Sequence, residues 1–244
     1  MLRDAQNSGQ LNRQRMAPTR SLAERLLRSA SRLRSRLWGG SELERWWASR
    51  PESYADDYFF ATDAYRRALI DRLISWHPAA TSFIELGCGG GGNLRLLADR
   101  KPEAEIEGIE IAEAVVDRAR ILFETHGYGD VRLQAGRIQD LLPLVNPRDV
   151  VFSCGTLCYI SPGEIEEVLE AIAQVARVGC VLMEPCAEGA QDQLPGADIW
   201  NHDLHRLAGA TWEVTPEPVT WSSADPSQVE TRFWRVFGQR DETA

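Results

Sequence analysis

One stretch of the chain combines a carboxylate with closely spaced glycines. Glu85 closes a short apolar run that begins at Ser82, and glycines follow at positions 87, 89, 90, 91 and 92. An apolar pattern at helical spacing then begins at Leu94, so we predict the order strand, tight turn, helix. Glycines let a ligand approach the main chain closely, and a first helical turn offers free N–H groups to polar or anionic ligand groups. The stretch is a candidate ligand site; the alternative is a surface turn that binds nothing.

Two common phosphate-binding loops fit this stretch poorly. A P-loop requires Gly-Lys followed by Ser or Thr, which does not occur here. A dinucleotide-binding loop also follows a strand, but here an acid stands two residues before the first glycine. The pattern Glu85-x-Gly87-x-Gly89-x-Gly91 instead resembles motif I of the class I S-adenosylmethionine-dependent methyltransferases. The resemblance covers about residues 55–240 and implies S-adenosyl-L-methionine as the cofactor.

A second acid, Glu110, lies near the end of the apolar segment 106–111, 23 residues after Gly87. In a βαβ unit this spacing brings the end of the second strand beside the glycine loop. The resemblance implies that Glu110 accepts hydrogen bonds from both hydroxyls of the adenosine ribose. The alternative is a solvated carboxylate at a strand end.

The third predicted strand, 131–135, is followed by Gly136-Arg137-Ile138, where the resembled family commonly has Gly-Asp. The resemblance therefore implies adenine contacts from the backbone N–H of Ile138 and from stacking on Arg137. The complete set of predicted cofactor-binding residues is Glu85, Gly87, Cys88, Gly89, Gly91, Glu110, Ile111, Arg137, Ile138 and Ser153.

Methyl transfer from a sulfonium is a direct displacement. It depends on alignment, and often on a base that removes a proton from a hydroxyl acceptor. His202 and Asp203 lie in a segment that commonly borders the acceptor pocket in the resembled family, so we predict them as an acid–base pair. The alternative is a surface helix with polar residues that occur by chance. Residues 154–160 should face the reacting methyl group, but they lack the Asn/Asp-Pro-Pro-Tyr signature of many enzymes that methylate nucleic-acid amines.

The order of the predicted elements indicates an α/β, Rossmann-like fold. Five alternating strand–helix units are followed by two strands, at 212–215 and 231–237. The expected sheet has seven strands and is mixed, mostly parallel with an antiparallel last strand, with helices on both faces and an N-terminal helical extension.

Helices before the glycine loop often cover the cofactor in the resembled family. We predict one helix over about residues 55–76, ended by His77-Pro78. Tyr54, Tyr58 and Tyr65 are therefore candidates for the pocket wall, with ordinary aromatic packing as the alternative.

Composition limits the other possibilities. The 244 residues are 43% hydrophobic, enough for one packed domain. We predict a methyltransferase domain over 55–244 after an arm of residues 1–54, whose first 20 residues or so are expected to be disordered.

No apolar run reaches the roughly 18 residues of a membrane span, and no secretory signal is evident. Five cysteines in apolar runs suit reduced thiols and a cytoplasmic protein, and Cys154-x-x-x-Cys158 lacks the partners of a metal site.

Charge is distributed unevenly along the chain, whose formal net charge is −9. Residues 1–36 carry nine arginines against Asp4 and Glu24, which is +7 and leaves −16 for the remainder. An acidic body argues against nucleic acid as a partner. Residues 21–37 predict a basic amphipathic helix, which would make peripheral contact with an anionic membrane, pack on its own domain or mediate dimerisation.

The predicted function is methyl transfer to a small-molecule or sugar/polysaccharide-type acceptor, by O-methylation. The similarity to sugar-modifying methyltransferases rests on the Arg-Pro-Glu-x-Tyr segment 50–54, on the glycine loop with Asn93, and on the His202-Asp203 pair. One alternative is a catalytically silent S-adenosylmethionine-binding regulatory or scaffold protein. Another is a nicotinamide-dependent oxidoreductase, against which the acid before the glycines argues.

Overall fold

A seven-stranded sheet forms the centre of the molecule, in the strand order β3-β2-β1-β4-β5-β7-β6. The computed structural model describes residues 42–185, 199–200, 202–204, 207, 217–218 and 234–238. The strands are β1 Ser82–Leu86, β2 Glu105–Glu110, β3 Arg132–Ala135, β4 Arg148–Cys154, β5 Ala176–Pro185, β6 Glu217–Pro218 and β7 Trp234–Gly238. Strands β1 to β5 pair in parallel, and β7 pairs antiparallel with both β5 and β6. The predicted α/β, Rossmann-like fold is confirmed.

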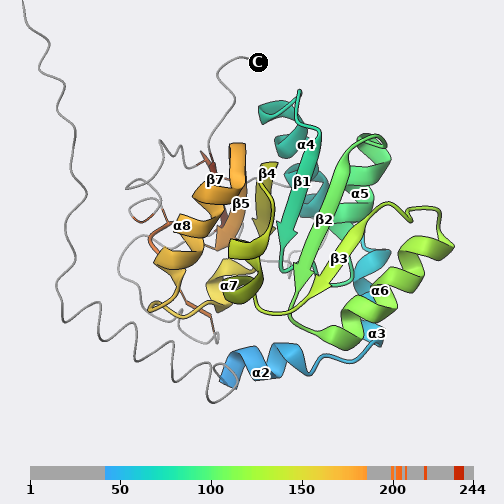
Figure 1. Cartoon of the computed structure of the whole chain (residues 1–244), viewed down its shortest axis with the longest axis horizontal. Coiled ribbons are helices and arrows are strands. Elements are labelled where there is room, and N and C mark those ends of the chain that lie inside the picture. Colours follow the sequence, from blue (N-terminus) through green and yellow to red (C-terminus); the bar gives the residue numbers. More distant parts are fainter. Residues whose placement is uncertain are drawn as a thin grey trace, which may run out of the picture.

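Helices cover both faces of this sheet (Figure 1). The helices are α2 Glu42–Ala48, α3 Ser53–Phe59, α4 Ala64–Trp76, α5 Gly92–Arg100, α6 Glu113–Thr125, α7 Ile138–Leu141 and α8 Ile165–Val175, with short 3-10 turns η1 Leu142–Leu144 and η2 Leu157–Tyr159. Side chains alternate across the strands, so Phe83 joins a core with α3 to α6, and Ile84 joins a second core with α7 and α8. Because both faces of the sheet are buried, the central strands consist of continuous apolar residues.

The predicted helix over residues 55–76 is two helices, α3 and α4, so this prediction was wrong. The break falls at residues 60–63, and α4 begins after Asp63, whose backbone is extended. Asp63 also accepts a hydrogen bond from Arg66 Nε at 3.1 Å. Thr62 and Asp63 stand directly before Ala64, and both residue types commonly precede a helix. The regular spacing of the aromatic residues on either side had suggested one continuous helix. Because of the break, α3 can lie against the glycine loop while α4 packs on the sheet.

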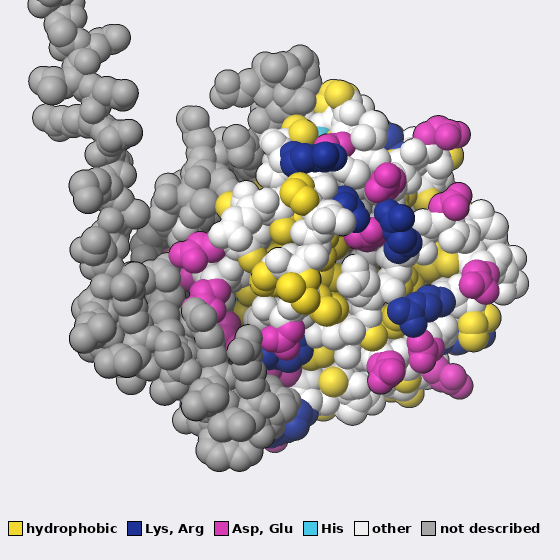
Figure 2. Space-filling model, viewed as in Figure 1, with side chains coloured by type: hydrophobic (Ala, Val, Ile, Leu, Met, Phe, Trp, Pro, Cys, Tyr) yellow, Lys and Arg dark blue, Asp and Glu magenta, His cyan; other side chains and the backbone are white. Residues whose placement is uncertain are grey.

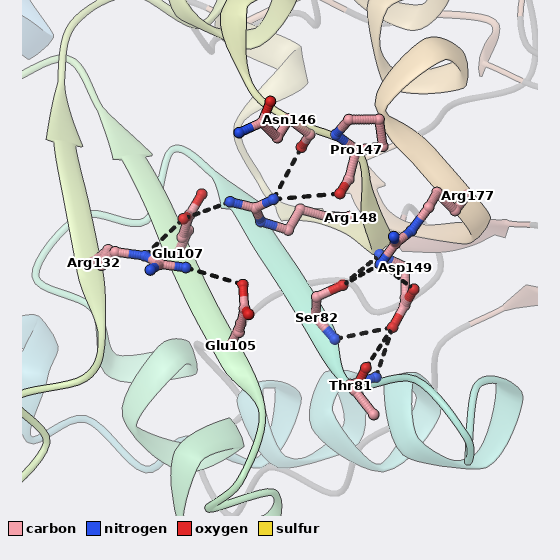
Figure 3. A network of polar contacts seen from close by, with 10 residues as sticks. All are labelled: Thr81, Ser82, Glu105, Glu107, Arg132, Asn146, Pro147, Arg148, Asp149 and Arg177. Atoms are coloured by element: carbon pink, nitrogen blue, oxygen red, sulfur yellow. Dashed lines mark hydrogen bonds and ion pairs between the residues drawn. The ribbon is translucent and has the colours of Figure 1, made fainter.

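The amino ends of the strands are joined by buried and half-buried ion pairs (Figure 3). Glu107 of β2 is 4% exposed, and its Oε1 lies 2.6 Å from Arg148 Nη2 and 2.8 Å from Arg132 Nε. Arg148 also donates to the carbonyl of Asn146. Strands β3, β2 and β4 are therefore tied together, across β1, at the end of the sheet that the glycine loop does not occupy.

A second cluster continues this network toward β1 and β5 (Figure 3). Asp149 Oδ2 accepts hydrogen bonds from the backbone N–H groups of Thr81 and Ser82, and its Oδ1 lies 2.7 Å from Arg177 Nη2. Burial opposes ionisation, but these donors and the Arg177 charge outweigh it and hold the pKa of Asp149 below its usual range. The amino end of the sheet is thus stabilised by charged groups.

Basic side chains (Lys and Arg) are interspersed with acidic ones (Asp and Glu) on the face seen in Figure 2. No continuous basic surface, which a nucleic-acid backbone would require, forms there among the described side chains. In the same part of the chain, no helix is both long and apolar enough to cross a membrane. The predicted basic helix at 21–37, the strand at 212–215, and His205 lie outside the described residues.

Candidate functional site

A cavity of about 160 Å³ opens beyond the carboxyl ends of β1, β2 and β4, where open α/β sheets bind ligands. Helix α2 lies across this end of the sheet (Figure 1). The lining residues come from α2, α3, the glycine loop and the segments after β2, β3 and β4: Glu44, Trp47, Tyr54, Tyr58, Gly87, Gly89, Glu110, Ile111, Gly136, Arg137, Ile138, Gln139, Cys154, Gly155, Thr156, Tyr159 and Ile160.

Six of the ten predicted cofactor-binding residues line this cavity: Gly87, Gly89, Glu110, Ile111, Arg137 and Ile138. The other four are Glu85, Cys88, Gly91 and Ser153; none is among the lining residues, and three are at most 4% exposed. Gly91 is buried against the ring of Phe123. The sequence pattern therefore locates the cavity, and some of its residues support the cavity from behind.

Glu110 lies on the cavity wall at the end of β2 and is 8% exposed. Its Oε2 accepts a hydrogen bond from Gly89 N at 2.9 Å, and its Oε1 accepts one from Ala112 N at 3.0 Å. Burial raises the pKa of this carboxyl, although hydrogen bonds from the backbone act in the opposite direction. The same side chain thus fixes the glycine loop and presents a carboxylate to the cavity.

The glycines of the loop differ in what surrounds them. Gly89 has a φ of +53°, and its surroundings are the rings of Tyr58 and Tyr54 at ordinary contact distance, so its backbone borders the cavity. A Cβ at Gly90 would instead meet the carbonyl oxygen of Ala55 at 2.4 Å. One glycine therefore serves close approach by a ligand, and the next serves the packing of α3 onto the loop.

A chain of buried polar groups runs behind the loop. Arg66 Nη1 donates to Asn93 Oδ1 at 3.1 Å, and Asn93 Nδ2 donates to Glu85 Oε1 at 2.6 Å. The other oxygen, Oε2 of Glu85, is buried and has no hydrogen-bond partner. Burial raises the pKa of Glu85 to about 8, against the effects of Asn93 and Arg66. The Glu85 carboxyl is thus enclosed behind the loop, with one oxygen outside this hydrogen-bond network.

A second buried carboxylate, Glu184, organises the loop after β4. Its Oε1 accepts hydrogen bonds from Ser153 Oγ at 2.7 Å and from Thr156 N at 3.1 Å. Burial raises the pKa of Glu184 to about 7 although these donors lower it. Thr156 and its neighbour Gly155 line the cavity, so Ser153 acts on the site by positioning this loop.

These two carboxylates predict that the ligand-free protein becomes less stable as pH rises from about 5 to about 8.5. Folded Glu85 and Glu184 hold protons with pKa values of about 8 and about 7, whereas unfolded glutamates release them near pH 4.5. The folded state therefore binds more protons in this range, and the free energy of unfolding falls by several kcal/mol as pH rises, since each unit of raised pKa corresponds to about 1.4 kcal/mol.

Urea denaturation at both ends of this pH range would measure the fall in stability. The double variant Glu85→Gln, Glu184→Gln should show a much flatter profile, since neither amide titrates. A wild-type protein whose stability rises over this range would contradict the prediction.

Arg137 lines the cavity, and carboxylates hold its guanidinium group. Its Nη2 lies 2.8 Å from Glu44 Oε1 and 3.0 Å from Glu164 Oε1, and Gln139 Nε2 donates to the same Glu44 oxygen at 2.9 Å. Glu44 is only 9% exposed. The predicted adenine stacking on Arg137 stays a prediction, and the observed contacts indicate that Arg137 anchors α2 over the cavity.

Aromatic side chains form the wall that α2 and α3 contribute. Tyr54 and Tyr58 stack with their ring centroids 4.2 Å apart, and Trp47 lies 4.9 Å from Tyr159 and 6.0 Å from Tyr54. Burial, then a hydrogen bond with Tyr58, raises the pKa of Tyr54, and burial raises that of Tyr159. These phenols stay protonated at neutral pH. The candidates Tyr54 and Tyr58 line the cavity, whereas Tyr65 packs against the core.

Glu44 and Trp47 are lining residues for which we predicted no role in the site. Tyr159 also lines the cavity, and it belongs to the segment 154–160 that we expected to face the reacting methyl group. Nothing in the spacing of Glu44 connects it with a site whose motif begins about 40 residues later.

His202 lies behind the cavity wall and is 2% exposed. Its Nε2 forms a hydrogen bond with the carbonyl oxygen of Ile160 at 2.9 Å, and its Nδ1 is buried without a partner. Burial lowers the pKa of His202, so the ring is neutral near pH 7. Neither His202 nor Asp203 lines the described cavity, although Ile160 does. No group of three or more potential metal ligands occurs among the described residues.

Comparison with known proteins identifies the domain around the glycine loop. A family model described as "Methyltransferase domain" matches residues 83–179. The trans-aconitate 2-methyltransferases of Acidovorax sp. (strain JS42) and Acidovorax ebreus (strain TPSY) are both 33% identical over 85 residues. The match covers 35% of this chain and 31% of each relative, so the chain spans about a third of the length of these curated relatives.

Solved structures share the fold beyond this range. The N-terminal domain of EvdMO1, crystallised in the presence of S-adenosylhomocysteine and D-fucose, has a TM-score of 0.57 at 21% identity, over 75% of this chain and 85% of that one. Magnesium protoporphyrin IX methyltransferase from Synechocystis PCC 6803, with bound S-adenosylhomocysteine, has a TM-score of 0.59 at 15% identity, over 80% and 96%. Residues 83–179 of the chain thus match a methyltransferase domain, and the chain shares its fold with a solved methyltransferase that holds S-adenosylhomocysteine.

Proposed function

We propose that this protein transfers the methyl group of S-adenosylmethionine to an oxygen atom of a small-molecule acceptor. The observation that carries the proposal is the pairing of Glu110 with Gly89 on the wall of the cavity. A carboxylate and an accessible main chain meet there, and both are needed to hold a nucleoside with free ribose hydroxyls. The cofactor supplies a methyl group on a positively charged sulfur, and the chain supplies position and charge.

The polar groups around the cavity fit the parts of this cofactor. Glu110 would accept from the ribose hydroxyls, and Ile111 and Ile138 would border the adenine. The unpartnered Oε2 of Glu85 would accept from the amino group, and Arg66, which hydrogen-bonds to Asn93 beside Glu85, would bring a positive charge near the cofactor's carboxylate. Burial makes such charge-assisted contacts stronger than they are in water.

A sugar-type acceptor is the finer form of this proposal. One relative of the same fold was crystallised with D-fucose, and the trans-aconitate 2-methyltransferases are named for an organic acid. The aromatic wall formed by Trp47, Tyr54 and Tyr159 suits the apolar face of a sugar ring as well as it suits a planar acid.

Two measurements test the proposed function. Calorimetric titration of S-adenosylhomocysteine should give micromolar binding. Incubation with S-adenosylmethionine and a panel of sugars, sugar acids and organic acids should then release S-adenosylhomocysteine with at least one acceptor. No binding in the titration would overturn the proposal. Binding without transfer to any acceptor would favour the catalytically silent alternative.

His202 and Asp203 remain the proposed acid–base pair, and the hydrogen bond to Ile160 assigns the accepting role to Nδ1 of His202. We expect His202→Gln to lower kcat by about 100-fold at neutral pH, because a general base contributes roughly that much. The limb of the pH–rate profile that reports the imidazole should disappear as well. An unchanged kcat together with lower thermal stability would show that His202 only holds Ile160 in the wall.

A further inference from the structure

Arg50 lies between α2 and α3, surrounded by aromatic rings. Its guanidinium carbon is 3.2 Å from the ring centroid of Trp46, 5.2 Å from that of Trp47 and 5.9 Å from that of Tyr54. Trp47 and Tyr54 line the cavity, and the Arg50 charge also acts to lower the pKa of Tyr159, a third lining residue. Arg50 is therefore next to two side chains of the aromatic wall, although it is not itself a lining residue of the cavity.

Arg50 is half-buried, and two of its three guanidinium nitrogens lack hydrogen-bond partners. Its Nε and Nη2 are buried and make no hydrogen bond. Within residues 42–185 and the shorter described segments, no carboxylate forms an ion pair with it. Aromatic rings stabilise a cation by less than it costs to withdraw its hydrogen-bond donors from water. The arrangement is unfavourable for stability alone, which points to a partner that binds there.

We infer that Arg50 binds an anionic oxygen group of the methyl acceptor, a carboxylate or a phosphate. The inference rests on the proposed function, because it assigns the acceptor to the same cavity. A guanidinium is planar and presents its N–H groups as a fork that matches either oxyanion. The stacked ring of Trp46 restricts the plane of this fork.

The cofactor's own carboxylate is assigned elsewhere by the arrangement of charges. Arg66 lies beside Asn93 and Glu85 behind the glycine loop, and its guanidinium is 4.8 Å from the ring of Tyr58. Arg50 is associated instead with Trp47 and Tyr54 of the aromatic wall. Two separate arginines therefore serve two separate anionic groups.

The first test requires no ligand. Arg50→Met keeps an unbranched apolar stem and removes the charge, and Arg45→Met removes the same charge from an exposed position of α2 as a control. Because the charge of Arg50 is unpaired, we expect the thermal midpoint of Arg50→Met to be no lower than that of Arg45→Met. A much lower midpoint would show that Arg50 is needed for folding, and would overturn the inference.

The second test compares matched probes on protein saturated with S-adenosylhomocysteine. Glucuronate, glucose 6-phosphate and trans-aconitate carry oxyanions, and glucose is the neutral control. We expect at least one charged probe to bind about tenfold more tightly than glucose, and this preference to disappear in Arg50→Met. Comparison of glucuronate with glucose 6-phosphate distinguishes a carboxylate from a phosphate.

The affinity for S-adenosylhomocysteine separates this inference from the proposed function. Arg50→Met should bind it within about twofold of the wild type, whereas a loss of about tenfold or more would assign Arg50 to the cofactor's carboxylate. Charged probes that bind no better than glucose, or equally well to both proteins, would also overturn the inference. A wild type that does not bind S-adenosylhomocysteine would overturn the proposed function itself.

Discussion

Glu110→Ala is expected to lower the affinity for S-adenosylhomocysteine by about 100-fold or more. The variant removes the carboxylate proposed to accept both ribose hydroxyls, and hydrogen bonds to a charged group contribute about 1.5–3 kcal/mol each. It also releases Gly89 N, which Glu110 holds at 2.9 Å, so the loop loses its arrangement as well. Two such losses together correspond to about two orders of magnitude in the dissociation constant.

Calorimetric titration of wild type, Glu110→Ala and Glu110→Gln would measure this effect. The glutamine variant keeps one acceptor oxygen and should lie between the other two. Glu113→Ala is the matched control, because Glu113 is an exposed acid in the first turn of the adjoining helix α6. Thermal melting would confirm that each variant is folded at the titration temperature. Unchanged affinity in a folded Glu110→Ala protein would overturn the ribose assignment.

Gly90→Ala is expected to destabilise the protein by about 3 kcal/mol and to weaken cofactor binding. The added methyl group would lie 2.4 Å from the carbonyl oxygen and 2.8 Å from the Cα of Ala55, which are backbone atoms that cannot rotate aside. Helix α3 would have to shift, at the cost typical of severe overpacking in a core. That helix carries Tyr54 and Tyr58, so the cavity wall would shift with it.

Gly129→Ala is a matched control for this substitution. A Cβ at Gly129 meets nothing within 4 Å, and its backbone lies outside the left-handed region. Its stability should stay within about 0.5 kcal/mol of the wild type. Chemical denaturation and titration with S-adenosylhomocysteine on both variants would separate the clash from the general effect of losing a glycine. Equal stability of the two variants would show that α3 is loosely attached to the loop.

The parts of the site that could be predicted from the sequence are those fixed by local geometry. A strand, a glycine turn and a helix follow one another along the chain, and the same βαβ unit carries Glu110 to the loop. Gly87, Gly89, Glu110 and Ile111 therefore meet at one cavity. Glu85 and Ser153 lie behind the cavity, and the cofactor contacts of all these residues stay predictions.

The remaining parts depend on contacts between distant segments, which no spacing rule reveals. Glu44 reaches the site because α2 lies across the carboxyl ends of the strands, where Arg137 and Gln139 bind it. The sequence shows that Arg137 stands where the resembled family commonly has aspartate. It does not reveal that Arg137 pairs with Glu44 and Glu164. Tyr159 lines the cavity because Glu184 fixes the preceding loop through Thr156, an interaction between two adjacent strand ends.

Apart from Tyr159, the aromatic wall comes from a segment outside the methyltransferase-domain match. Residues 42–59 supply Glu44, Trp47, Tyr54 and Tyr58, whereas the methyltransferase-domain match spans 83–179. Under the proposed function, the glycine loop and Glu110 would hold the cofactor, and residues 42–59 would shape the space for the acceptor. Exchanging residues 42–59 for another sequence would then offer a route to redirecting methylation without rebuilding the sheet.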